Sequence, residues 1–201
     1  MCTDSSAEYA SVLLPIARAA IAERFGRKLA THQDAPWLQQ PGACFVTLTQ
    51  HGQLRGCIGS LQAQRDLLSD VKANAVAAAF RDPRFAPLTA AELERTEIEI
   101  SLLSALQALH FASQAEALAQ LRPGLDGVVF AYRQHRSTFL PQVWQQLPDA
   151  QQFMAQLKQK AGLPADFWAD GVRLERYSVS KYREADWPAR TDPAQPAAGA
   201  T

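Results

Sequence analysis

The sequence predicts an α+β fold, in which helices cover antiparallel or mixed sheets. Three observations support this. Apolar residues recur at helical spacing over residues 8–25, the turn-forming pair His51-Gly52 separates two runs of strand formers, and residues 97–103 alternate between apolar and polar. Because hairpin, helices and separate strands follow one another in mixed order, we expect α+β instead of a regular series of strand–helix–strand units.

The N-terminal elements are a helix and a hairpin. The helix is predicted over residues 8–25, with Gly26 suited to its C-terminal end. Pro15 should kink this helix or begin a new first turn. The hairpin strands are predicted at 43–49 and 54–61, around a two-residue turn whose glycine adopts a positive φ freely.

The remaining elements follow from similar patterns. We predict helices at 66–80 and 113–121 and a helix that Asp149 caps and Gly162 closes, with strands at 97–103, 128–130, 137–140 and 172–179. Residues 185–201 are rich in Pro and Ala and offer little apolar surface, so we expect a disordered tail. The folded part is then a single domain over residues 1–184.

The bulk composition limits the functional classes. The 201 residues carry 20 basic and 20 acidic side chains, so no overall field draws the chain to nucleic acid or to an anionic membrane. Asp4 and Glu8 stand where a secretory signal would be positively charged, and no apolar run approaches the roughly 20 residues that span a bilayer. We therefore expect a cytoplasmic protein that binds neither nucleic acid nor membrane.

The cysteines predict neither disulfides nor a metal centre. Cys2, Cys44 and Cys57 are an odd and widely spaced set, and the four histidines are scattered. We expect no metal site and no cofactor.

The hexapeptide Leu54-Arg55-Gly56-Cys57-Ile58-Gly59, hereafter the motif, is the strongest functional signal. A two-residue turn would place Val46 opposite Cys57 and Cys44 opposite Gly59. Cys44 and Cys57 would then share a sheet face about 7 Å apart, with Arg55 on the same face. A guanidinium beside a thiol stabilises the thiolate, and glycines allow a ligand to approach closely. This predicts Cys57 as a nucleophile or redox thiol and Arg55 as its electrostatic partner.

A purely structural role for Cys57 is the favoured alternative. Cysteine is among the most buried residue types, and glycines in strands often mark a bulge or tight packing. No base is identifiable either: His51 lies at the turn tip, too far from Cys57 for direct contact, whereas His110 and His135 could approach only through the fold.

Other polar residues complete the candidate site. Asp82 and Arg84 follow a predicted helix and are either solvated charges at its end or side chains at a cleft. Gln142 either presents its amide to a ligand or simply follows a strand. Together with Gly56, Ile58 and Gly59 they form the candidate ligand-binding set. The charges at 158, 160, 173 and 176 are expected on solvent faces.

Seven segments in this order resemble the AMMECR-type domain family. They are Phe45-Val46-Thr47-Leu48, Gly52–Gly59, Asp82-Pro83-Arg84-Phe85, Glu97–Ser101, Asp126-Gly127, Leu140-Pro141-Gln142-Val143 and Lys160–Pro164. The resemblance implies two closely joined subdomains and a site around Leu54–Gly59. Where family members often carry a small Gly-rich turn before Leu140, this chain has residues 133–138, which places a ligand site built from that loop in doubt.

The resemblance also implies partners, because the bacterial family is associated with a Memo-like protein and a radical S-adenosylmethionine protein. This chain is not the radical enzyme, because its three cysteines are too far apart for that cluster motif. Two hypotheses follow. The chain is a partner protein of a multi-protein system, or it is a self-contained enzyme that uses Cys57.

Overall fold

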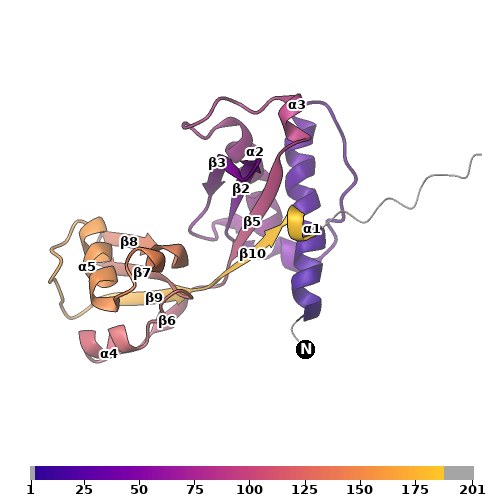
Figure 1. The fold of residues 1–201 in the computed structure, drawn as a ribbon. Helices are drawn as coiled ribbons and strands as arrows, with labels where there is room; N and C mark the ends of the chain where they lie inside the picture. Colours follow the sequence, from indigo (N-terminus) through magenta and orange to yellow (C-terminus); the bar gives the residue numbers. More distant parts are fainter. Residues whose placement is uncertain (1–2, 188–201) are drawn as a thin grey trace, which may run out of the picture.

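The computed structural model describes residues 3–187, and it confirms the α+β fold (Figure 1). The chain forms two lobes that lie side by side, each built on a four-stranded antiparallel sheet. The first lobe holds α1, α2 and the strand order β10-β5-β2-β3, and the second holds α4, α5 and the strand order β6-β9-β7-β8.

The elements of the first lobe follow the sequence pattern closely. They are α1 (Thr3–Glu23), η1 (Pro36–Gln39), β1 (Pro41–Gly42), β2 (Cys44–Gln50), β3 (Gln53–Gly59), β4 (Arg65–Asp66), α2 (Leu67–Phe80), α3 (Ala90–Leu93), β5 (Glu97–Leu103), β10 (Val179–Arg183) and η3 (Glu184–Asp186). Helix α1 continues through Pro15 as one element, so the alternative of a new first turn is wrong. Asp66 caps α2 by accepting a hydrogen bond from the Ser69 N–H at 2.8 Å.

The core of the first lobe lies between the two long helices and one face of the sheet. Leu13, Ile16 and Ile21 of α1 and Val71 and Ala75 of α2 pack against the apolar face of β2 and β5. Burial of these side chains stabilises the lobe because it removes apolar surface from water. The opposite face of the sheet carries alternate, more polar residues, and no described helix of this lobe packs on it.

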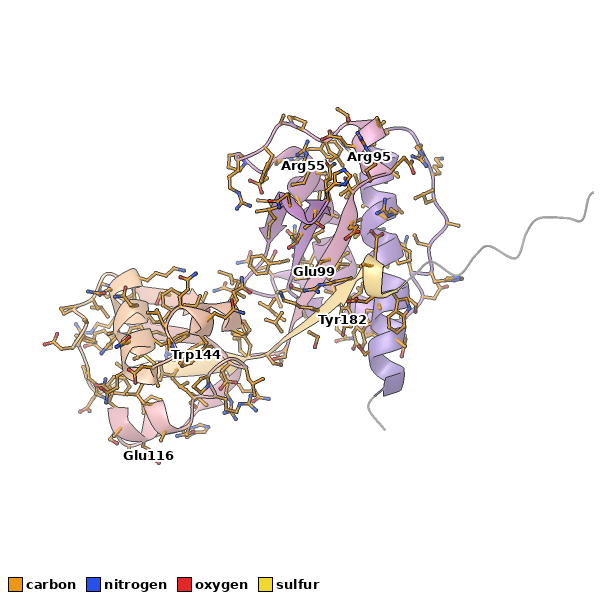
Figure 2. All side chains as sticks on the ribbon, in the orientation of Figure 1. Arg55, Arg95, Glu99, Glu116, Trp144 and Tyr182 are labelled. Carbon is orange, nitrogen blue, oxygen red and sulfur yellow. The ribbon has the colours of Figure 1, made fainter. Side chains whose placement is uncertain are left out.

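The second lobe has its own core. Its elements are β6 (Gln107–Leu109), α4 (Gln114–Ala119), β7 (Gly127–Tyr132), β8 (His135–Phe139), η2 (Pro141–Gln145), α5 (Ala150–Lys160) and β9 (Arg173–Tyr177). Phe130, Trp144 and Phe153 are buried at its centre, and the last two rings stack 3.8 Å apart (Figure 2 labels Trp144).

Two features join the lobes. A small apolar cluster of Ala43, Leu103, Val129 and Tyr177 draws on both sheets. The chain also crosses twice, between β5 and β6 and between β9 and β10, and the crossings are held by the Ser104 N–H donating to the Ser178 carbonyl at 3.0 Å.

Three predictions on the fold need correction. The single strand expected at 172–179 is two strands, β9 and β10, because the chain changes sheets at Ser178. Lys158 is buried, not solvated, and its Nζ donates to the Phe167 carbonyl at 2.9 Å. The predicted tail begins too early, since residues 185–187 are described and form the end of η3 and the residue after it. Residues 188–201 lie outside the described part.

Candidate functional site

The motif forms β3, which within residues 3–187 pairs only with β2 and therefore lies at an edge of its sheet. The turn is as predicted: Gln50 lies opposite Gln53, and His51 and Gly52 have φ values of 50° and 75°. A β-bulge between Leu48 and Thr49 then shifts the register by one residue.

The shift overturns the predicted relation of the two cysteines. Cys57 lies opposite Thr47 instead of Val46, and Gly59 lies opposite Phe45 instead of Cys44. Because side chains alternate along a strand, Cys44 and Cys57 point to opposite faces of the sheet. Cys44 is fully buried under α2, where burial raises the pKa of its thiol well above the ordinary range. Cys44 is therefore a core residue.

Cys57 lies half-exposed on the face that the long helices leave uncovered. Its Sγ is 3.4 Å from the Thr47 hydroxyl, and its backbone is held from outside the sheet. The Asp82 carboxylate accepts the Cys57 N–H at 2.8 Å, and the Arg84 guanidinium donates to the Cys57 carbonyl at 3.3 Å. Two side chains thus occupy the hydrogen-bonding groups that a further strand would use.

Asp82 is the centre of this arrangement. Its carboxylate is buried and also accepts from the Arg84 N–H at 3.1 Å, from Arg84 Nε at 2.9 Å and from Arg84 Nη2 at 2.6 Å. The bonds from Arg84 hold the pKa of Asp82 well below its usual range, and they outweigh the opposing effect of burial. Asp82 is therefore a fixed anion that ties the segment after α2 to β3.

Arg55 is engaged elsewhere. Its guanidinium forms a two-point pair with Glu92, with Nε–Oε1 at 3.0 Å and Nη2–Oε2 at 3.3 Å. Figure 2 shows Arg55 at the end of the first lobe near α3. The predicted placement beside the thiol is thus corrected, because the guanidinium near Cys57 belongs to Arg84.

Glu92 serves two purposes. It caps α3 by accepting the Thr89 N–H at 2.8 Å, and it holds Arg55. The hydrogen bonds from Arg55 and from the Thr89 backbone lower the pKa of Glu92 to about 2. Phe85 lies between the two arginines, with its ring centre 5.9 Å from the Arg55 guanidinium and 5.5 Å from that of Arg84.

The glycines of the motif are required by packing. A Cβ on Gly56 would overlap the Ala78 carbonyl of α2, and one on Gly59 would overlap the Phe45 ring. Ile58 packs against the core of the first lobe. These three residues of the candidate ligand-binding set therefore seat β3 on its neighbours.

In the described part of the chain, the other candidates form no hydrogen bond with the motif. Gln142 is exposed in η2 of the second lobe, among elements remote in sequence from β3. His135 Nδ1 lies 2.8 Å from the Ala161 carbonyl. Within residues 3–187, the hydrogen bonds of the Cys57 sulfur reach Thr47 and no histidine.

Sequence reasoning missed a buried polar network behind the motif. Asp70 of α2 accepts from the Ser60 hydroxyl at 2.7 Å, Arg65 Nε at 2.8 Å, the Cys44 N–H at 2.9 Å and the Asn74 amide at 2.9 Å. Asp70 and Asn74 occur on the buried stripe of a predicted helix, and polar residues on such a stripe are the signal that could have revealed them.

The fold and this edge define a class: a two-lobed α+β protein whose motif strand is fastened by an aspartate–arginine pair. The AMMECR1 family model matches residues 14–182, and the chain belongs to that family. It is 32% identical to "Protein MJ0810" of Methanocaldococcus jannaschii over 169 residues, which cover 80% of this chain and 82% of that protein.

Two further matches agree with this assignment. A protein of Methanothermobacter thermautotrophicus is 35% identical over 181 residues, which cover 86% of this chain and 92% of the relative. The crystal structure of an uncharacterized protein, PH0010 from Pyrococcus horikoshii, matches with a TM-score of 0.69 and 27% identity, over 88% of this chain and 91% of that one.

Two absences concern the described residues alone. No helix within residues 3–187 has the length and apolar character needed to cross a bilayer. In the same range, no group of three or more His, Cys, Asp or Glu side chains is placed to hold a metal ion.

Proposed function

We propose that this chain is a binding component of a multi-protein system with a Memo-like protein and a radical S-adenosylmethionine protein. Its contact surface is the motif edge, defined as β3 together with residues 82–85. The observation that supports this most directly is the pairing of Asp82 with both the Cys57 backbone and Arg84. In these bonds the charged groups of the motif edge contact one another and the β3 backbone, which holds the edge rigid.

A rigid edge suits recognition. Groups that are already fixed lose little conformational freedom when a partner binds, so less of the interaction energy is spent on ordering them. Leu54, the second residue of β3, is 42% exposed, which makes it an apolar anchor for a partner. The association of the AMMECR-type family with the two partner proteins supports their choice.

Affinity measurements with purified partners test the proposal. The chain should bind the Memo-like protein or the radical enzyme encoded in the same genome, and Leu54→Glu should weaken binding about tenfold or more. Leu125→Glu is the matched control, because Leu125 is 60% exposed in the second lobe and lies outside the motif edge. Absence of binding, or equal binding by both variants, would contradict the proposal.

Cys57 chemistry is a second candidate, favoured by one observation. Cys57 is half-exposed, its sulfur is 3.4 Å from the Thr47 hydroxyl, and the Arg84 guanidinium is bonded to the Cys57 carbonyl. Substrate turnover by the isolated chain that is lost in Cys57→Ala, with unchanged circular dichroism, would select this candidate over the binding role.

A further inference from the structure

A cleft of about 730 Å³ lies between the two lobes, outside the motif edge. One wall is formed by the loop from Ser60 to Arg65, with Asp70 behind it, and the other by β8 and the last residue of α5. This volume lies in the range of small-molecule sites. The cleft is therefore large enough for an organic ligand that touches both lobes.

The charges on the two walls are mostly positive. Arg65 comes from the first lobe, and Arg136 and Lys160 come from the second, against the single carboxylate of Asp70 in the lining. The Asp70 carboxylate is buried and already accepts four hydrogen bonds. Glu175 lies opposite Val129 on the same sheet face, and its carboxylate is 3.5 Å from the Arg136 guanidinium. The lining residues thus carry an excess of two positive charges, and Glu175 beside Arg136 reduces the local excess to one.

The cations keep donors for a ligand. In the part of the chain that the structure describes, the hydrogen bonds of Arg65 use its Nε alone, so both terminal nitrogens remain available. Lys160 Nζ donates one hydrogen bond, to the Thr138 carbonyl at 3.0 Å, although an ammonium group has three donors. Both residues are exposed to solvent.

The remaining lining suits the body of an organic anion. Side-chain amides of Gln62 and Gln64 offer further donors, while Leu61 and Val129 add apolar surface. Guanidinium forks and an ammonium group from different elements are the arrangement that binds phosphate or carboxylate oxygens strongly.

We propose that this cleft binds a small organic anion with at least two negative charges, such as a phosphate ester or a polycarboxylate. The ligand contacts Arg65 on one lobe and Arg136 and Lys160 on the other. Because the lobes are otherwise joined by a small apolar cluster and two chain crossings, a bound anion also fastens one lobe to the other. The proposal is independent of the partner-binding role.

Calorimetric titration of the full chain with inorganic pyrophosphate and with citrate tests it at low salt. At least one probe should bind, and combining Arg136→Gln with Lys160→Gln should weaken that binding about ten- to a hundredfold. Arg65 is left intact in this test because its Nε holds the buried Asp70. The probe that binds more tightly distinguishes a phosphate-bearing from a polycarboxylate ligand.

The matched control removes the same charge elsewhere. Arg24→Gln combined with Lys28→Gln removes two exposed cations from the segment that follows α1, and neither residue lines the cleft. This control should bind the probe as the wild type does. The proposal is overturned if neither probe binds up to about 10 mM, or if the two double variants weaken binding equally.

Discussion

Replacing Asp82 with asparagine should destabilise the protein substantially. The wild-type carboxylate is 4% exposed and accepts hydrogen bonds from Arg84 Nε at 2.9 Å and Nη2 at 2.6 Å, from the Arg84 N–H, and from the Cys57 N–H. Asparagine retains one oxygen for a backbone donor, but its NH₂ group then faces the Arg84 guanidinium. The variant therefore loses the ion-pair hydrogen bonds from the Arg84 guanidinium.

The size of the effect follows from those bonds. A hydrogen bond between charged groups contributes about 1.5–3 kcal/mol, and the half-exposed Arg84 side chain places the pair at the lower end of that range. Adding the cost of the misplaced amide, we expect Asp82→Asn to lower the free energy of unfolding by about 2–3 kcal/mol. Urea unfolding followed by circular dichroism measures this.

The pH dependence provides a second check on the same variant. Because the pKa of Asp82 is lower in the folded state than in the unfolded state, its contribution is complete above about pH 5 and is lost as the pH falls through the folded pKa. The difference between wild type and Asp82→Asn should therefore be constant from about pH 5 to 7 and shrink below about pH 4.

A control separates this from a general charge effect. Asp34→Asn removes an exposed carboxylate and should change the free energy of unfolding by less than about 0.5 kcal/mol. Hydrogen exchange of the Cys57 amide should quicken in Asp82→Asn and not in Asp34→Asn. A loss below about 0.5 kcal/mol in Asp82→Asn, with an unchanged Cys57 amide, would refute the role assigned to Asp82.

Three further predictions follow from the contacts. Gly56→Ala should lower the free energy of unfolding by about 3 kcal/mol or more, because the new Cβ would overlap the backbone of α2. Gly52→Ala should lower it by about 1 kcal/mol, because the alanine meets only an unfavourable φ. Equal losses in urea unfolding of the two variants would contradict this. Iodoacetamide followed by peptide mass spectrometry should label Cys57 in the native protein and Cys44 only after unfolding; native labelling of Cys44 would show that its burial is wrong. Burial lowers the pKa of Lys158, so the wild type should gain stability relative to Lys158→Met as the pH rises toward about 10, and a constant difference would contradict this.

The sequence predicts the hairpin turn but not the register beyond it. His51-Gly52 is a local signal, and the structure confirms it through positive φ values at both residues. The bulge between Leu48 and Thr49 has no such signal. It coincides with Gly56 seating against α2, a contact between segments that only the fold brings together. Local sequence signals therefore place Cys57 on a strand correctly, but they predict the wrong cross-strand neighbour for it.

Long-range contacts account for the other differences. Asp82 and Cys57 are 25 residues apart, and the sequence alone left open whether Asp82 reached a cleft or solvent. The chain changes sheets at Ser178 without any Gly or Pro to mark the break. Lys158 shares a helix face with apolar side chains, and burial of its stem requires the carbonyl of Phe167 at the right distance. None of these contacts can be predicted from the spacing of apolar residues along the chain.

Hydrogen–deuterium exchange with the Memo-like protein and the radical enzyme tests the binding role most directly. The motif edge, β3 with residues 82–85, is predicted to gain protection when the partner is added, while α4 in the second lobe keeps its exchange rates. Protection confined to the second lobe, or no change in either lobe at saturating partner, would contradict the assignment of the motif edge as the contact surface.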